Sequence, residues 1–148
     1  MFDIGVLVDT NVIANEVGED VLLERHPFYD DSFLVFQLVD QEHIRGYVSA
    51  VSITDIFYIV QKQQEKNVAR NAVKQLLRVF YPATVSDRDI YRAVELEWDD
   101  FEDSVQYTIG EGLSVNYIIT RDTLDFSSGS IEALTPKKFI QVIADIEQ

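Results

Sequence analysis

The first apolar run of the chain, Ile4-Gly5-Val6-Leu7-Val8, constrains the fold more than any other stretch. Its residues do not alternate with polar ones, a pattern typical of a strand that is buried on both faces in a parallel sheet. Asp9 follows directly, where the chain must turn. Because ligands of open α/β sheets bind at the carboxyl ends of the strands, a carboxylate at this point indicates a candidate site.

Strand-like and helix-like segments alternate through the rest of the chain. Further strands are predicted at 46–49, 83–85 and 115–119, and helices at 11–17, 30–43, 53–63, 67–81, 87–97, 101–113 and 136–146. Several of these helices begin next to a residue that commonly caps a helix, namely Ser52, Asn67, Ser86, Asp100 and Thr135. The alternation predicts an α/β fold with a parallel sheet covered by helices on both faces.

Length and composition point to one domain spanning residues 1–148. The chain has 148 residues, of which 47% are hydrophobic, and a chain of this length buries about two-thirds of its unfolded surface. It has no cysteine, which excludes disulfides and thiolate metal sites. We find neither a secretory signal nor a run of about 20 apolar residues, and therefore expect a soluble, cytoplasmic protein with no membrane segment.

The net charge restricts the partners of the protein. The chain carries 26 acidic residues against 12 lysines and arginines, for a net charge of −14. Such a charge is an unfavourable overall field for binding a polyanion. Solubility by itself is one explanation of this charge, because acidic residues keep a protein soluble. A more specific interpretation is that some acids are clustered to hold cations, and that any basic partner is another protein.

Three short polar segments fall where the predicted strands end or a helix begins: Asp9-Thr10-Asn11, Asp100-Phe101-Glu102-Asp103 and Thr120-Arg121-Asp122. Each has an ordinary explanation. Asp9 fits a turn or a helix cap, and acids in the first turn of a helix are favoured by its dipole. Their convergence at one edge of the sheet is less ordinary and favours a shared site.

A cluster of carboxylates favours a hard metal ion. Like charges raise one another's pKa values and disfavour ionisation, and a divalent cation relieves that repulsion. Carboxylate-and-water sites suit Mg²⁺ or Mn²⁺. The two histidines, His26 and His43, have no spacing typical of metal ligands. We find no histidine or lysine placed as a general base, so a metal-activated water would have to be the nucleophile.

Four segments together resemble the PIN domain. They are Val6-Leu7-Val8-Asp9-Thr10-Asn11, Tyr47-Val48-Ser49 with Ser52-Ile53-Thr54-Asp55-Ile56, the Asp100–Asp103 segment, and Thr120-Arg121-Asp122 with Asp125-Phe126. The resemblance spans nearly the whole chain in the expected order. It implies a three-layer α/β/α sandwich, Rossmann-like, with a parallel sheet of about five strands. It also implies a Mg²⁺- or Mn²⁺-dependent endoribonuclease, often the toxin of a toxin–antitoxin module.

Matched position by position, the resemblance implies a catalytic set of four acids. Asp9, Asp103 and Asp122 match the metal ligands of the family, with Asp9 and Asp103 holding the main ion. Asp55 falls where many members have glutamate, and its shorter side chain would reach a metal through a water. Supporting polar positions are Asn11, Ser49, Thr120 and Asp125.

This reading predicts that the protein hydrolyses RNA phosphodiesters, with a small antitoxin-like protein as a partner and a homodimer as the assembly. One alternative is a catalytically idle PIN-like module whose acidic surface binds a basic partner. Another is phosphotransfer through Asp9, as in response-regulator receivers or related phosphatases. Against the phosphatases, the segment reads Asp-Thr-Asn where a second aspartate is expected two residues after the first.

A basic stripe is predicted on the helix at 67–81. Arg70, Lys74 and Arg78 recur at four-residue steps, so they drift by only about 40° per step around the helix. Lys62 and Lys66 lie just before them. The stripe is either a solvated face opposite an apolar one or a positive track that guides the RNA backbone toward the carboxylates.

Overall fold

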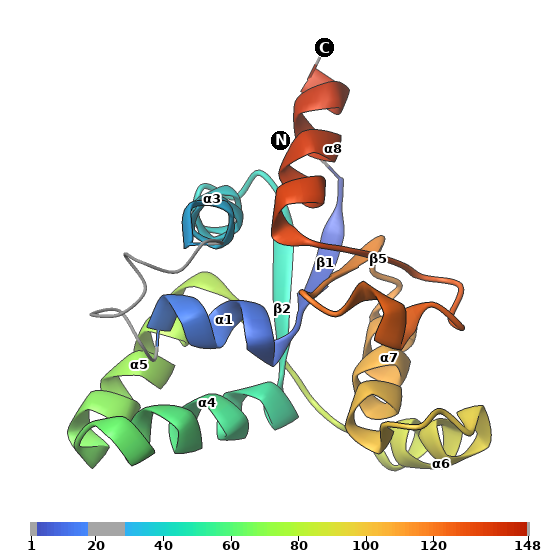
Figure 1. The fold of residues 1–148 in the computed structure, drawn as a ribbon, viewed down its shortest axis with the longest axis horizontal. Coiled ribbons are helices and arrows are strands. Elements are labelled where there is room, and N and C mark those ends of the chain that lie inside the picture. The colour runs from blue at the N-terminus through green and yellow to red at the C-terminus, as the bar shows by residue number, and fades with distance from the viewer. Residues whose placement is uncertain (1–2, 18–28, 148) are drawn as a thin grey trace.

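The structure is a computed structural model that describes residues 3–17 and 29–147. Its centre is a five-stranded sheet in the order β3-β2-β1-β4-β5, and every neighbouring pair is parallel (Figure 1). The strands are β1 (Gly5–Val8), β2 (Arg45–Ser49), β3 (Tyr81–Ala83), β4 (Tyr117–Ile119) and β5 (Glu132–Leu134). The parallel sheet predicted from the sequence is therefore confirmed, with five strands.

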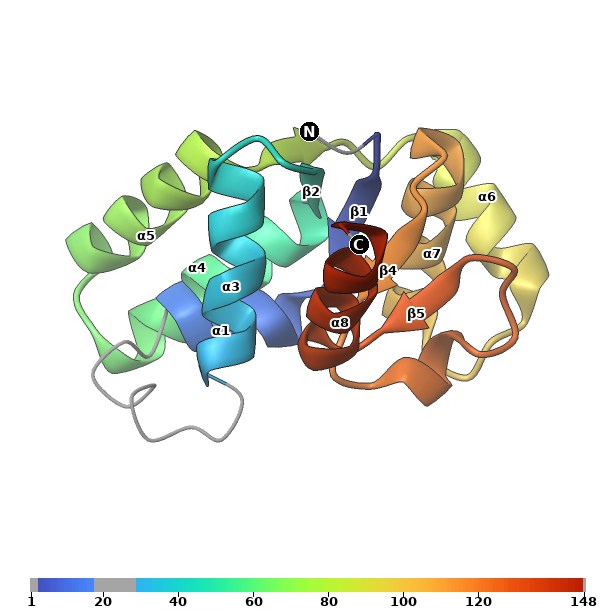
Figure 2. The same cartoon turned by 90° about the horizontal axis from the view of Figure 1, so that it is seen from above.

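Helices cover both faces of the sheet, as a three-layer sandwich requires (Figure 2). One layer contains α1 (Thr10–Val17), α3 (Tyr29–Asp40), α4 (Ala50–Gln63), α5 (Lys66–Val79) and α8 (Pro136–Glu147). The other contains α6 (Asp87–Leu96), α7 (Phe101–Leu113) and the short 3₁₀ helix η1 (Thr123–Phe126). The first layer packs through contacts of α3 with α8 and α4 with α5, and the second through α6 with α7.

The central strand β1 explains why two layers are needed. Val6 and Val8 point into the core beneath the first layer, whereas Leu7 points into the core beneath α6 and α7. All three side chains are at most 1% exposed. A strand that is apolar on both faces is stable only when both faces are covered, because each buried aliphatic side chain contributes about 1.5–3 kcal/mol by leaving water.

Several helix boundaries differ from the sequence prediction. Helix α4 begins at Ala50, and Ser49 rather than Ser52 caps it, since the Ser49 Oγ accepts from the Ser52 N–H at 3.1 Å. Helix α5 begins at Lys66 after Glu65, which makes no side-chain cap, so Asn67 lies inside the helix. Helix α3 begins at Tyr29, so the aspartates that follow it lie within its first turn.

Other predicted starts are confirmed. Ser86 and Asp89 form a reciprocal capping box at α6, Asp100 caps α7, and Thr135 accepts from the Lys138 N–H at the start of α8. Strand β3 lies two residues before its predicted position at 83–85. Strand β5 was not predicted individually, because its three residues form no continuous apolar run.

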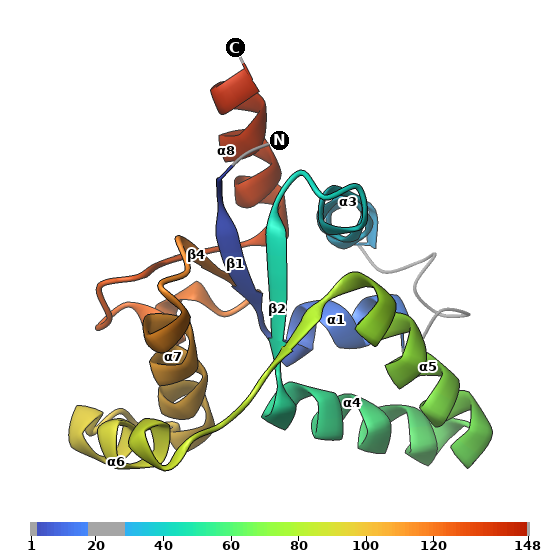
Figure 3. The ribbon, with the colours of Figure 1, turned by 180° about the vertical axis from the view of Figure 1, so that it is seen from behind.

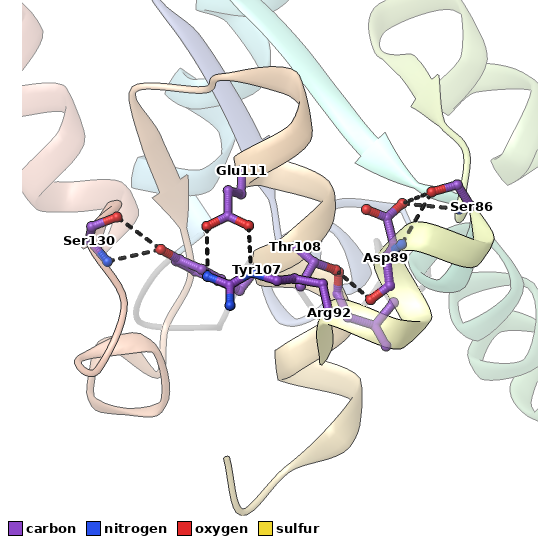
Figure 4. Close-up of polar contacts among 8 residues, drawn as sticks. Ser86, Asp89, Arg92, Tyr107, Thr108, Glu111 and Ser130 are labelled. Atoms are coloured by element: carbon purple, nitrogen blue, oxygen red, sulfur yellow. Dashed lines mark hydrogen bonds and ion pairs between the residues drawn. The ribbon is translucent and has the colours of Figure 1, made fainter. Parts of the chain in front are cut away.

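Polar contacts join α6, α7 and the loop before β5 (Figure 4). Arg92 on α6 forms an ion pair with Glu111 on α7 through two hydrogen bonds of 3.1 and 3.2 Å. The Tyr107 hydroxyl accepts from the Ser130 N–H at 2.9 Å. These contacts hold α7 in place, and with it the acidic residues of its first turn.

Of the two histidines, His43 lies within the described residues and does not line the pockets at the ends of the strands. His43 is partly buried in the turn after α3, where its N–H donates to the Leu38 carbonyl at 2.9 Å. His26 lies outside the described residues. No helix within the described ranges combines the length and apolar character needed to cross a membrane.

Candidate active site

A pocket of about 510 Å³ lies at the carboxyl edge of the sheet, where α1, α4 and α7 begin. Figure 3, in which the molecule is seen from behind, shows β1 and β2 running toward this edge. Helices and loops from four parts of the chain contribute carboxylates to it. The acidic residues that line the pocket are Asp9, Asp55, Asp100, Glu102, Asp103, Asp122 and Asp125. The edge at which the sequence predicts a site is therefore an acidic pocket.

Asp9 lies between β1 and α1. It stands at the start of α1 and it also lines the pocket, so both roles considered from the sequence apply to it. Its carbonyl accepts from the N–H groups of the first turn of α1, at 3.1 Å from Val12. Its Oδ1 accepts from the Thr10 N–H at 2.8 Å, and its Oδ2 accepts from the Thr120 hydroxyl at 2.9 Å. Burial nevertheless raises the pKa of Asp9, because desolvation outweighs these hydrogen bonds and nearby Asp122 adds repulsion.

Thr120 connects three of the predicted site residues. The fully buried Thr120 hydroxyl donates to Asp9 and accepts from the Asn11 amide at 3.3 Å and from the Asp122 N–H at 3.1 Å. The Asn11 amide also donates to the Asp122 carboxylate at 3.2 Å. Asn11 Oδ1 accepts from the Arg121 N–H at 3.2 Å. The segments after β1 and β4 are thus fixed to each other by side chains as well as by strand pairing.

A second group of hydrogen-bonded side chains, centred on the buried Ser52, connects the elements at the same edge of the sheet. The Ser52 hydroxyl accepts from Gln106 Nε2 at 2.6 Å and from the Thr10 hydroxyl at 2.7 Å, so it ties α1, α4 and α7 together. Ser49, a predicted supporting residue, lies in this group with its Oγ 3.3 Å from the Ser52 Oγ. Ser49 is fully buried and is the cap of α4. Gln106 Oε1 is buried and makes no hydrogen bond within the described chain.

The first turn of α7 holds three acids close together. Asp100 caps the helix by accepting from the Asp103 N–H at 3.0 Å. Burial raises the pKa of Asp103 to about 7, with further repulsion from Asp100 and Asp9. A pKa raised to near neutrality means that the surroundings disfavour the ionised form of Asp103. Ionising this carboxyl in the folded protein therefore costs free energy.

Glu102 is a pocket residue that the sequence prediction did not assign. A hydrogen bond with Asp55 raises its pKa to about 7, assisted by desolvation and by the charge of Asp55. The signal was present, because Glu102 belongs to the same acidic segment as Asp103. Adjacent residues on a helix differ by about 100° in direction, however, and only the packing of α7 reveals that both reach the pocket.

Three residues of α4 were also missed as part of the site: Tyr58, Ile59 and Lys62. Ile59 is partly buried and lines the pocket, whereas Ile56 and Val60 on the same helix are fully buried in the core. The spacing offered a signal, since 58, 59 and 62 lie three, four and seven positions after Asp55 and share its face of the helix.

The basic stripe does not reach this pocket within the described structure. Arg70, Lys74 and Arg78 are exposed on α5, and none of them lines the acidic pocket. Arg78 instead lines a separate pocket of about 430 Å³ together with Arg45 and Gly46, which lie at the amino end of β2. Whether the stripe binds RNA stays a prediction.

The donor set fits a hard divalent ion, although its side chains are not already closed around one. Within residues 3–17 and 29–147, no group of three or more histidines and acids is arranged so that it could hold a metal ion as it stands. The pocket donors are all oxygens, and the pKa values of Asp9, Glu102 and Asp103 are all raised. An all-oxygen donor set with excess negative charge suits Mg²⁺ or Mn²⁺ better than softer metals.

The fold has relatives among solved structures. VapBC2 from Rickettsia felis, bound to a DNA fragment from its promoter, matches with a TM-score of 0.67 at 13% identity, covering 89% of this chain and 98% of the other. VapC20 from Mycobacterium tuberculosis, described as a sarcin-ricin loop cleaving toxin, matches with a TM-score of 0.65 at 14% identity over 84% and 95% of the chains. A toxin–antitoxin complex from Klebsiella pneumoniae matches with a TM-score of 0.63 at 18% identity over 88% and 97%.

Sequence comparison identifies the family more directly than these distant structures. No curated protein matches the chain. The sequence does match the profile of the PIN domain over residues 5–124, a range that begins with β1 and ends within η1. That range includes every acid of the pocket except Asp125. The chain therefore belongs to the PIN domain family.

Proposed function

We propose that the protein is a metal-dependent endoribonuclease that hydrolyses RNA phosphodiesters in the acidic pocket. The observation that carries this proposal is the gathering of seven carboxylates from four parts of the chain in one pocket at the carboxyl edge of the sheet. Structural acids are ordinarily paired or solvated, and a fold that holds them together against mutual repulsion needs a cation to offset it. Membership of the PIN domain family supports a nuclease.

Asp9, Asp103 and Asp122 would hold the metal, and Asp55 with Glu102 would complete the site or orient the attacking water. A bound divalent cation supplies charge neutralisation at the phosphodiester and lowers the pKa of a coordinated water. The chain itself fixes the direction of Asp9 through Thr10 and Thr120. Its raised pKa values near neutrality mean that cation binding and proton release are linked at this site.

Hydrogen bonds prepare the pocket before any ligand arrives. Thr120 donates to Asp9 and Asn11 donates to Asp122, and both carboxylates also line the pocket. Asp125 lies on η1 at the pocket wall and adds to the charge felt by Asp9. We assign Asn11, Thr120, Ser49 and Asp125 positioning roles, because the contacts of the first three act on neighbouring groups of the chain.

The named relatives suggest the biological setting. VapC20 is described as cleaving the sarcin-ricin loop, and other relatives are described as toxin–antitoxin complexes. We propose RNA as the substrate, a small antitoxin-like protein as the partner and a homodimer as the assembly. A gene for a small DNA-binding protein next to the coding frame would support the toxin–antitoxin part of this proposal.

Cleavage by rigorously purified protein tests the function. We expect a structured RNA to be cut with Mg²⁺ or Mn²⁺ and left intact with a chelator, and the Asp9→Asn variant to be inactive at saturating Mn²⁺. Asp87→Asn is the matched control, since Asp87 is exposed at the start of α6 and lines a different surface. Equal activity of the Asp9→Asn variant and the wild type would exclude Asp9 from the site.

Two assays, RNA cleavage and acyl-phosphate trapping, separate the two alternatives. An idle interaction module would cleave nothing with either metal. Phosphotransfer through Asp9 would give a trapped acyl phosphate after incubation with a phosphodonor. The sequence is unfavourable for a phosphatase of this kind, because Asn11 stands where a second aspartate is expected two residues after Asp9.

A further inference from the structure

The α4 wall of the acidic pocket differs chemically from the rest of the pocket. On α4, beyond Asp55, the pocket is lined by Tyr58, Ile59 and Lys62. Among the described residues that line the pocket, Lys62 is the one basic side chain and Tyr58 the one aromatic. A metal ion has no use for either, so this wall requires a separate explanation.

Helix geometry brings Tyr58 and Lys62 to the same place. Residues four apart on a helix lie one turn above each other on the same face. Tyr58 is 63% exposed, so much of its ring is accessible to a ligand. The Phe57 ring meets the Tyr58 ring edge-on, with centroids 6.4 Å apart and planes at 89°. This contact restricts the orientation of the exposed ring.

The charge of the pocket makes Lys62 significant. Seven carboxylates repel any phosphate that approaches, and metal ions at Asp9 and Asp103 would offset that repulsion only where the reaction takes place. A polynucleotide has further phosphates on either side of that point. Lys62 lines the pocket seven residues after Asp55 and one helical turn from Tyr58, where it can serve as the positive partner of a neighbouring phosphate.

We propose that Tyr58 and Lys62 form a nucleotide-binding subsite, in which the base of an unpaired nucleotide stacks on Tyr58 and its backbone phosphate contacts Lys62. This inference rests on the proposed ribonuclease function and adds two residues of this chain that would bind the substrate beside the reacting phosphate. The pocket volume of about 510 Å³ lies in the range of about 300–1,000 Å³ that is common for small-ligand sites. Base–aromatic stacking tolerates any sequence, because every base has a π-face.

The subsite restricts the substrate to unpaired regions. In an RNA duplex each base is stacked between its neighbours, so its faces are not accessible to a side chain. A nucleotide in a loop or a single strand presents both faces. The protein should therefore cut loops and single strands and leave continuous duplex intact, although the carboxylates by themselves do not distinguish the two.

Steady-state cleavage of a short single-stranded RNA tests the role of Tyr58. We expect Tyr58→Ala to raise KM on the order of tenfold, within the range reported for loss of one stacked base, and to change kcat little. Tyr58→Trp should preserve KM, because it keeps a stacking surface, whereas Tyr58→Leu should behave like alanine. Tyr91→Ala is the matched control, since Tyr91 is 72% exposed on α6 and lines a different surface pocket.

The role of Lys62 has its own readout. Lys62→Ala should reduce the salt dependence of RNA binding by about 0.7 in the slope of log affinity against log salt, as expected for one phosphate contact on a single strand. Arg88→Ala on α6 serves as the control, because Arg88 is exposed and lines a different surface pocket. An unchanged salt slope in Lys62→Ala would overturn the phosphate contact.

A fluorescence measurement distinguishes failure of this inference from failure of the proposed function. The probe is a single-stranded RNA with one 2-aminopurine, bound to wild type with Ca²⁺ present and scanned over successive positions. Quenching at one position that disappears in Tyr58→Ala and survives in Tyr58→Trp supports the subsite. If wild type cuts RNA but Tyr58→Ala shows normal KM and normal quenching, the subsite is wrong and the nuclease stands. If wild type neither binds nor cuts RNA, both proposals fail.

Discussion

Acidic side chains at the two ends of α7 lie in opposite electrostatic environments. Near its carboxyl end, Glu111 is paired with Arg92 through two hydrogen bonds, and the neighbouring helix α6 holds Asp89 in a capping box with Ser86 (Figure 4). At its amino end, Asp103 and Glu102 face other carboxylates, and their pKa values rise to about 7. Within the described chain, neither ion pair given by the geometry involves an acid of the pocket.

This contrast separates acids that serve the fold from acids that await a ligand. A carboxylate paired with a guanidinium or a capped backbone stabilises the folded state without any added component. Carboxylates held against each other destabilise it until a cation binds. Both kinds of acid occur on α7, so variants of Asp103 and Glu111 compare them within one helix.

The largest expected difference is in catalysis. Asp103→Asn should abolish metal-dependent RNA cleavage while the protein remains folded, since the amide cannot replace the carboxylate as a metal ligand. Glu111→Gln, on the same helix, should retain wild-type cleavage. Initial rates at saturating Mn²⁺ measure both, with circular dichroism to check the fold. The comparison breaks if the Asp103 variant keeps its rate or if the Glu111 variant loses it.

The next effect concerns stabilisation by a divalent cation. Mass action predicts that a ligand at 100 times its dissociation constant stabilises the folded wild type by about 2.7 kcal/mol. The Asp9→Asn, Asp103→Asn double variant should gain almost none of this, because it lacks both main ligands. Scanning calorimetry with and without Mg²⁺ gives the values. Equal Mg²⁺ stabilisation of the two proteins would sink the shared-site hypothesis, whatever the cleavage assay shows.

A smaller effect is expected from the basic stripe on α5. Reversing Arg70, Lys74 and Arg78 to glutamate should weaken RNA binding across all sequences and flatten its salt dependence, because backbone contacts carry no base specificity. Metal affinity and the melting profile should change little, since all three side chains are exposed and outside the acidic pocket. If the triple variant binds and cuts RNA normally at low salt, the stripe is only a solvated face.

How much of this contrast the sequence predicts depends on the range of the interactions. The apolar β1 with Asp9 at its end, the capping box of α6 and the Asp100 cap of α7 are local patterns, so the fold class and the edge of the sheet could be predicted. The resemblance to the PIN domain added the order of the acids. The pairing of Ser52 with Gln106 joins residues 54 positions apart and has no local signal.

The parts that were missed follow from the same cause. Three-residue β5 at the edge of the sheet has too few apolar positions to be recognised, and it forms because β4 offers it a partner. Ser49 rather than Ser52 caps α4 because the cap is set by where β2 ends. Glu102 joins the pocket because the packing of α7 turns its first turn toward Asp55. Each outcome depends on tertiary contacts that a local pattern does not contain.

The smallest expected effect is on the stability of the metal-free protein, and it has opposite signs at the two kinds of acid. Asp89→Ala removes half of the capping box of α6 and should cost about 1 kcal/mol, typical of a lost cap. That loss corresponds to a melting temperature lower by about 2–4 °C in a chain of this length. Asp103→Asn should leave the melting temperature unchanged or raise it, because it relieves repulsion from Asp100 and Asp9.

The pH dependence of stability gives the sign of the Asp103→Asn effect independently. The pKa of Asp103 is about 7 in the folded protein against an ordinary value of 3.8, so between these values the folded state holds the extra proton. Stability must therefore fall as the pH rises from about 4 to 7, and this contribution is absent in Asp103→Asn. Thermal melts in a chelating buffer should show the variant gaining on the wild type across that interval. A gap that stays constant or narrows with rising pH would show that Asp103 is not held against repulsion, and the two ends of α7 would then not differ in kind.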